Sequence, residues 1–321
     1  LAGLPNTVPG ITINRFCASG LQAVADAAAR IRLGEADVMI AAGTESMSVM
    51  PQIMGNKISL NPAIFARDEN LAIAYGMGLT AEKVAQQWQI SRADQDAFAV
   101  ESNRRAVAAI AAGAFRDEIT PYLMSSYKPG EGGAVRVTER LCDTDEGPRA
   151  DASLETLGKL KPVFAARGSV TAGNSSQMSD GAGAVLLMSE AAVKRYGATP
   201  IARFRSYAVA GVPPEVMGIG PVEAIPRALK AAGIAQEALD WIELNEAFAA
   251  QALAVARQLG LDPAKVNPLG GAIALGHPLG ATGAIRTATL MSAMQRGQAR
   301  FGMISMCIGT GMGAAGVFEK V

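Results

Sequence analysis

The fold class is decided by residues 14–44, NRFCASGLQAVADAAARIRLGEADVMIAAGT. Apolar residues recur at helical spacing from Leu21 to Leu33, which predicts a helix that begins just after Cys17. The apolar run at 37–43 then predicts a short buried strand. A helix that leads directly into a buried strand is typical of an α/β fold.

The same plan returns near the C-terminus. Residues 271–280, GAIALGHPLG, precede a predicted helix over 281–296 and a predicted strand over 301–306. This echo predicts two similar halves that face each other, with Cys17 and His277 at equivalent helix starts.

The segment between the halves differs from them in sequence pattern and composition. Amphipathic helices are predicted over 80–88 and 92–112, the second with Ser91 as its N-cap. Residues 128–149 are polar and glycine-rich. We interpret the segment as an inserted subdomain. The expected domains are an N-terminal half at 1–47 and 166–191, an inserted loop domain at 48–165 and a C-terminal half at 192–321.

Composition and charge exclude several classes of protein. Apolar residues make up 50% of the 321 positions and charged residues 18%, which is typical of a compact enzyme. Basic and acidic residues balance at 29 each, so no global positive field exists to hold nucleic acid or an anionic membrane. No apolar run reaches the length of a membrane span. Three cysteines without Cys-x-x-Cys spacing favour a reducing compartment, and we expect the cytoplasm.

The candidate chemistry centres on the only histidine and two of the cysteines. His277 is flanked by glycines that allow a ligand or backbone to approach, and it is either a base or an ordinary turn histidine. Cys17 stands at a helix start, where the macrodipole favours a nucleophilic thiolate; a buried, inert cysteine is the alternative. Together these residues suggest thiolate chemistry.

Two further residues have suitable surroundings. Cys307 precedes a glycine-rich loop whose N–H groups could form an oxyanion hole, or it is a plain cysteine at the end of a strand. Asn245, in LNEAFAA at 244–250, is suited to orient a water or hold a carbonyl, or to cap a helix. Cys142 lies in a charged stretch and has no such context.

Four motifs carry a resemblance to a known family. The segments NRFCASGLQA at 14–23, NEAFA at 245–249, GGAIALGHP at 270–278 and CIGTGMG at 307–313 resemble, in this order, the active-site signatures of thiolases. The similarity runs essentially from end to end and includes TAGNSS at 171–176. Within the family it is greatest to the enzymes that cleave 3-ketoacyl-CoA.

The resemblance implies a fold and roles for five residues. The fold would be a five-layer αβαβα sandwich of two similar halves, with the inserted loop domain over the active site. Cys17 would accept the acyl group and His277 would take its proton. Asn245 would hold a water beside His277 in one oxyanion hole, and Cys307 would move the proton at C2 of acetyl-CoA. The backbone N–H groups of Cys17 and Gly309 would form the other oxyanion hole.

Coenzyme A would be a substrate, and the resemblance implies no permanently bound cofactor and no metal. It places Arg149 near the nucleotide and Ser176 near the pantetheine, with Met77 also in contact. Phe164 would pack against the adenine or fill the core. Arg149 has an alternative as a solvated loop residue.

The implied reaction is cleavage of 3-ketoacyl-CoA by CoA into acetyl-CoA and a shortened acyl-CoA, through an acyl-cysteine intermediate with ping-pong kinetics. Acetyl-CoA acetyltransferase, which runs the condensation, is one alternative, and a non-catalytic thiolase-like protein that binds acyl-CoA or lipid is another. A papain-like protease uses the same residue types, but no Trp follows Cys17 within two residues. A homodimer or homotetramer is expected, with a partner enzyme of β-oxidation as a further expectation.

Two departures from the family pattern affect these expectations. The strand and helix units that family members have before the nucleophile motif are absent, so we expect an incomplete N-terminal half. Gly76 stands where short-chain thiolases often carry His, which favours longer substrates.

Overall fold

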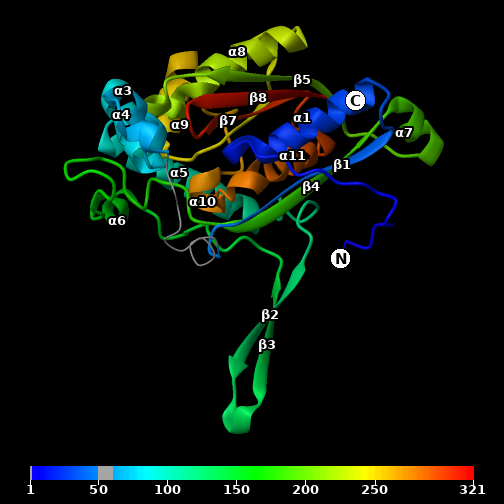
Figure 1. Cartoon of the computed structure of the whole chain (residues 1–321), viewed down its shortest axis with the longest axis horizontal. Helices are drawn as coiled ribbons and strands as arrows, with labels where there is room; N and C mark the ends of the chain where they lie inside the picture. Colours follow the sequence, from blue (N-terminus) through cyan, green and yellow to red (C-terminus); the bar gives the residue numbers. More distant parts are fainter. Residues whose placement is uncertain (1, 50–60) are drawn as a thin grey trace.

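The computed structural model describes residues 2–49 and 61–321. Its body is built of alternating layers of helices and strands (Figure 1). A four-stranded sheet has the order β5-β8-β7-β6, and the central helices α1 and α11 separate it from a second sheet of β1 and β4. Helix α8 packs on the opposite face of the larger sheet. The elements of these layers are α1 (Ser19–Arg32), β1 (Val38–Ser46), β4 (Asp180–Met188), β5 (Ala202–Gly211), α8 (Gly220–Ala232), β6 (Trp241–Leu244), α11 (Leu279–Gln295), β7 (Phe301–Ile308) and β8 (Met312–Lys320).

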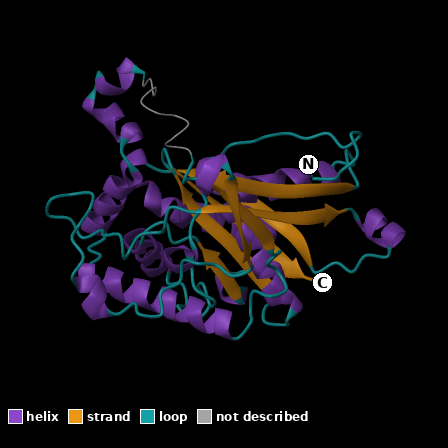
Figure 2. Ribbon diagram, turned by 90° about the horizontal axis from the view of Figure 1, so that it is seen from below, coloured by secondary structure: helices purple, strands orange, loops and turns teal. Residues whose placement is uncertain are grey.

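The pairing of strands joins distant parts of the sequence. Strand β4 pairs antiparallel with β1, from Val38 opposite Met188 to Ser46 opposite Asp180. In the larger sheet β8 is antiparallel to both β5 and β7, whereas β6 is parallel to β7. Figure 2 shows the strands crossing the middle of the molecule with helices around them. The chain therefore returns to its first sheet after residues 47–179.

The predicted α/β fold and its two central helices are confirmed. Among the described residues the layers run helix, sheet, helix, sheet. The outer face of β1 and β4 has no helical layer within this part of the chain, and Val38, Ile40 and Leu186 are exposed there.

Close contact between α1 and α11 fixes the centre of the molecule. A Cβ added to Gly20 would lie 2.5 Å from the backbone nitrogen of Ala284, and one added to Gly283 would lie 2.1 Å from that of Leu21. Only glycine fits at such a backbone-to-backbone crossing. The start of α1, which follows Cys17, is thereby held against the first half of α11, which follows His277.

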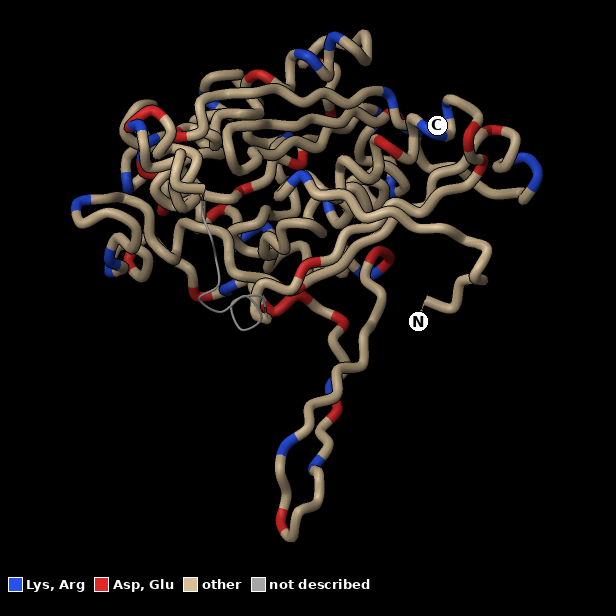
Figure 3. The backbone as a smooth tube through the Cα atoms, viewed as in Figure 1, with Lys and Arg blue, Asp and Glu red and all other residues tan. Residues whose placement is uncertain are grey.

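The inserted segment contributes short helices and one long hairpin. Ser91 caps α5 by accepting a hydrogen bond from the Asp94 nitrogen, as predicted. The hairpin of β2 and β3 was not predicted, and it projects from the body with charged side chains along its length (Figures 1 and 3). The elements are η2 (Pro62–Phe65), α3 (Asp68–Leu71), η3 (Ala72–Ala74), α4 (Met77–Gln87), α5 (Arg92–Ala111), β2 (Tyr122–Pro129), η4 (Glu131–Gly133), β3 (Val135–Cys142) and α6 (Leu154–Gly158).

The remaining elements connect these layers. They are η1 (Phe16–Ala18), α7 (Glu190–Tyr196), η5 (Pro214–Ile219), η6 (Gln236–Ala238), α9 (Ala249–Leu259) and α10 (Ala272–Leu275). Within the described residues, no helix combines the length and the apolar character that crossing a membrane requires.

Candidate active site

Cys17 lies in η1, the single 3-10 turn that leads into α1. The backbone N–H groups of Gly309 and of Cys17 itself reach its sulfur and favour the thiolate, but burial outweighs them and raises the pKa to about 11. Nearby Glu45 adds to the rise. The predicted position at a helix start is confirmed, whereas the predicted fall in pKa is wrong because the thiol is enclosed.

His277 stands between α10 and α11, and residues of the first turn of α11 hold its ring. Its Nδ1 lies 2.7 Å from Oγ1 of Thr282, which donates its own proton to the Pro278 carbonyl. This network favours a proton on Nδ1 and leaves the lone pair on Nε2. Burial and the charge of Arg286 lower the pKa of His277 to about 3, so the imidazole is neutral near pH 7.

Asn245 meets His277 from the loop after β6. Its Nδ2 lies 3.3 Å from Nε2 of His277. The helix that follows, α9, begins at Ala249 with Phe248 as its N-cap, so Asn245 is not the helix cap that the sequence left open. Its Oδ1 is buried and has no hydrogen-bond partner among the described residues. A buried amide oxygen of this kind is suited to a water or a ligand group.

Cys307 and Gly309 occupy the end of β7 and the turn that follows it. Cys307 is fully buried, and burial together with the nearby Cys17 raises its pKa. The turn runs into Thr310, whose φ of 69° lies in the left-handed region. A Cβ added to Gly309 would lie 3.6 Å from Sδ of Met77, so the start of α4 covers this turn.

These residues form two adjoining groups. Cys17, Cys307 and the Gly309 nitrogen converge in one group, and His277 and Asn245 form the other. The turn η1 packs against both α11 and β7, which brings the two groups to the same region of the molecule. The structure thus places the five residues for which catalytic roles were predicted in two groups, carried by elements that pack against one another.

The residues expected to contact CoA are more dispersed. The backbone nitrogen of Ser176 donates to the Ala247 carbonyl, beside the Asn245 loop. The ring of Phe164 meets Phe248 edge to face at 6.0 Å and is 41% exposed, so it is neither a core residue nor a free surface one. The side chain of Arg149 is exposed at the surface.

Sequence reasoning missed the residues that hold this site in place. Thr282 supports the His277 ring, and Oγ of Ser179 accepts a hydrogen bond from the His277 backbone nitrogen. Glu246, which follows Asn245, is also buried in the same region. The position of Thr282 in the helical turn after His277 was a usable signal for its role, whereas Ser179 is brought there only by the fold.

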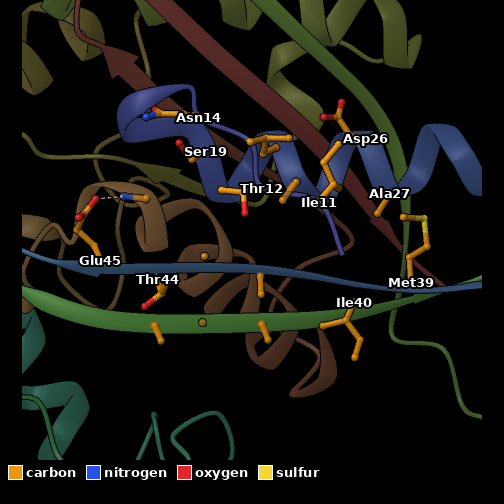
Figure 4. Close-up of a pocket in the computed structure, with 18 of the residues that line it drawn as sticks. Ile11, Thr12, Asn14, Ser19, Asp26, Ala27, Met39, Ile40, Thr44 and Glu45 are labelled. Carbon is orange, nitrogen blue, oxygen red and sulfur yellow. Dashed lines mark hydrogen bonds between the residues drawn. The ribbon is translucent and has the colours of Figure 1, made fainter. Parts of the chain in front are cut away.

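A large cleft lies beside this site. It has a volume of about 1740 Å³ and runs between residues 11–16, α1 and the sheet of β1 and β4 (Figure 4). Glu45 lines it and accepts a hydrogen bond from the Gly280 nitrogen at 3.1 Å. None of the five catalytic candidates lines the cleft, so the convergence of side chains identifies the candidate site better than the size of this hollow.

Comparison with known families agrees with this geometry. Residues 1–191 match the family described as thiolase, N-terminal domain, and residues 198–320 match thiolase, C-terminal domain. The chain belongs to the thiolase family. The predicted membership of the thiolase family and the predicted thiolase fold are therefore confirmed.

Similar proteins include enzymes of this family from bacteria and eukaryotes. A 3-ketoacyl-CoA thiolase of Bacillus subtilis (strain 168) is 52% identical over 319 residues, which are 99% of this thiolase and 81% of the relative. The dimeric peroxisomal thiolase of Saccharomyces cerevisiae has a TM-score of 0.89 at 43% identity, over 99% of this chain and 78% of that one. Human mitochondrial 3-ketoacyl-CoA thiolase in complex with CoA has a TM-score of 0.87 at 41% identity, over 99% of this chain and 80% of that one.

Proposed function

We propose that this thiolase cleaves 3-ketoacyl-CoA with CoA to give acetyl-CoA and a shortened acyl-CoA. The observation that carries the proposal is the convergence of a thiol, two backbone N–H groups and a second thiol, beside a neutral imidazole paired with an amide. The names of the relatives support the same substrate class.

In the first step, Nε2 of His277 takes the proton of the Cys17 thiol, and the sulfur attacks C3 of the substrate. The oxygen at C3 becomes an alkoxide, which the N–H groups of Cys17 and Gly309 stabilise. Both N–H groups reach the Cys17 sulfur, so they lie close to the carbon that the sulfur attacks and to the oxygen that it carries.

In the second step, the bond between C2 and C3 breaks and leaves an acyl group on Cys17 with the enolate of acetyl-CoA. His277, now protonated at Nε2, and a water held by Asn245 Oδ1 stabilise the enolate oxygen. Cys307 gives its proton to C2 and releases acetyl-CoA. Cys307, now a thiolate, takes the proton of the CoA thiol, and the CoA sulfur attacks the acyl carbon and displaces the Cys17 sulfur. His277 then returns its proton to the Cys17 sulfur.

Turnover separates this proposal from a non-catalytic thiolase-like protein that binds acyl-CoA or lipid. Acetoacetyl-CoA as its magnesium enolate absorbs light, and the absorbance should fall after CoA is added together with the protein. The Cys17→Ala variant should abolish the change. Binding of acyl-CoA without any loss of absorbance would favour the non-catalytic alternative.

Chain length separates the proposal from acetyl-CoA acetyltransferase. Gly76 precedes α4 beside Met77, and a Cβ added there would meet nothing within 4 Å. We expect kcat/KM to be higher for 3-ketohexanoyl-CoA than for acetoacetyl-CoA, by roughly tenfold at about 0.8 kcal/mol per buried methylene. Gly76→His places its Cβ in open space and should reduce this preference. A wild-type preference for the four-carbon substrate would favour the acetyltransferase.

We further propose that the protein is a homodimer in the cytoplasm. For CoA we propose contacts with Arg149, Ser176, Phe164 and Met77. Free cysteines fit a reducing compartment, and the yeast relative is dimeric, although it is peroxisomal. Light scattering in solution distinguishes a dimer from a tetramer. Fractionation of cells distinguishes the cytoplasm from an organelle.

A further inference from the structure

The Glu246 carboxylate joins three separate segments beside the candidate site. It is 2% exposed and accepts hydrogen bonds from Oγ of Ser102 at 2.7 Å, from Nδ2 of Asn267 at 2.8 Å and from the backbone nitrogen of Ile273 at 3.2 Å. Ser102 belongs to α5 of the inserted segment, and Ile273 to α10. A single side chain thus links the Asn245 loop, the inserted segment and the loop that leads to His277.

The loop that leads to His277 is pressed directly onto this carboxylate. A Cβ added to Gly271 would lie 2.0 Å from the carboxyl carbon of Glu246, and the Gly271 nitrogen donates to Oγ of Ser102 at 3.0 Å. On the other side of the carboxylate, Asn267 is fixed to the end of β6, because it accepts a hydrogen bond from the Leu244 nitrogen and donates one to the Leu244 carbonyl. The distance between the two loops is therefore set through Glu246.

Asn245 directly precedes Glu246, and His277 lies four residues after Ile273, just beyond the end of α10. The 3.3 Å separation of Asn245 Nδ2 and His277 Nε2 spans the same two loops. We propose that Glu246 is a positioning residue that fixes the oxyanion hole formed by Asn245 and His277. The inference rests on the proposed function, because that hole stabilises the enolate in the cleavage step.

The carboxyl group of Glu246 matters because every one of its partners is a donor. Ser102 can rotate its hydroxyl, but the nitrogen of Ile273 can only donate, and Asn267 cannot turn its amide without losing the bond from Leu244. A glutamine amide at this position would face a donor in either orientation. Glu246→Gln should therefore loosen the two loops while keeping nearly the same volume.

Glu243 offers a matched control, because it is also a buried carboxylate and lies three residues earlier. It is 1% exposed, accepts a hydrogen bond from Nε1 of Trp241 at 2.6 Å and pairs with Arg286 at 3.5 Å. Its own carboxylate has no hydrogen bond to residues 271–277 among the described interactions. Arg286 also donates to the Gly270 carbonyl at 3.5 Å, so Glu243→Gln should cost stability of the same kind and reach the His277 loop only indirectly, through Arg286.

The experiment compares C–C cleavage with acyl transfer onto Cys17 in the wild type, Glu246→Gln, Glu243→Gln and Ser102→Ala. Cleavage is followed by acetyl-CoA release from acetoacetyl-CoA and CoA, acyl transfer by mass spectrometry of the Cys17 peptide with acetyl-CoA alone, and folding by thermal unfolding. For Glu246→Gln we expect kcat for cleavage to fall by about tenfold or more, with acyl transfer reduced less, since acyl transfer uses the N–H groups of Cys17 and Gly309. Ser102→Ala should shift the ratio of cleavage to acyl transfer in the same direction, and Glu243→Gln should change that ratio much less than Glu246→Gln does.

Two outcomes overturn the inference in different ways. Equal ratios in Glu246→Gln and Glu243→Gln would mean that Glu246 contributes only to stability. If Glu246→Gln does not fold, the same test rests on Ser102→Ala, which removes one hydroxyl from the network, and an unchanged ratio there overturns the inference. If the wild-type protein shows no cleavage, the proposed function itself is contradicted, before any variant is compared.

Discussion

The Cys17 thiol and the His277 imidazole are both neutral in this thiolase before substrate binds. Burial raises the pKa of the thiol to about 11 and lowers that of the imidazole to about 3. A thiolate–imidazolium pair at rest would need these two pKa values in the opposite order. In the proposed mechanism the Cys17 thiolate is therefore generated during the reaction rather than held in advance.

The pH profile of Cys17 alkylation tests whether the pKa of the Cys17 thiol lies above that of the His277 imidazole. Because the thiolate fraction rises about tenfold per pH unit below the pKa, the rate of reaction with iodoacetamide should climb continuously from about pH 7 to about pH 10. Mass spectrometry of the Cys17 peptide separates its alkylation from that of Cys142. A plateau near neutral pH would show that Cys17 is already a thiolate at rest.

Cys307→Ala should separate the two half-reactions. Only cleavage needs an acid at C2 of acetyl-CoA, so acyl transfer from acetyl-CoA onto Cys17 should survive while cleavage falls by about a hundredfold or more. Cys142→Ala is the control, because Cys142 lies on the projecting hairpin. Equal losses in both half-reactions would assign Cys307 a structural or shared role.

At this scale the sequence identified the candidate residues but not their electrostatics. Glycine-flanked Cys17, Cys307 and His277 were recognisable from composition and motif. The pKa of Cys17 was predicted in the wrong direction because the cost of burial depends on the packing of distant segments around the thiol. For Asn245, only the three-dimensional start of α9 at Ala249 excludes the helix cap.

Among the elements, the contact of α1 with α11 has the greatest consequence for the site. Gly283→Ala should destabilise the protein by about 1–3 kcal/mol and reduce activity, because the added methyl meets the backbone nitrogen of Leu21 and pushes apart the two helices that carry Cys17 and His277. Gly158→Ala in α6 is the control, since a Cβ there meets nothing within 4 Å. Thermal unfolding and thiolysis assays on both variants check this, and equal behaviour of the two would contradict it.

Helical periodicity predicted elements well where one face is buried. The helix expected at 92–112 is observed as Arg92–Ala111, and that expected at 281–296 as Leu279–Gln295. Almost every residue of the hairpin of β2 and β3 is exposed, so neither strand has a buried face. The alternation of Val135, Arg136, Val137 and Thr138 is too brief to have marked a strand within this polar segment.

For the whole molecule, two similar halves place their central helices against each other and so bring together residues from the two ends of the chain. The family and its fold were predictable because four ordered motifs survive in the sequence. The separation of Asn245 and His277 was not, since it depends on buried contacts of Glu246 with three segments far apart in sequence. No motif of comparable specificity in the sequence indicates the chain length of the substrate or the state of assembly.

In the proposed mechanism, Cys17 carries the acyl group between the two half-reactions. The most direct measurement is peptide mass spectrometry after the protein is incubated with a 3-ketoacyl-CoA in the absence of free CoA. We predict that acetyl-CoA is released, that the shortened acyl group is found on the Cys17 peptide, and that added CoA removes it as acyl-CoA. An acyl group on Cys142 or Cys307 instead, or acetyl-CoA release with no acylated peptide, would contradict the account.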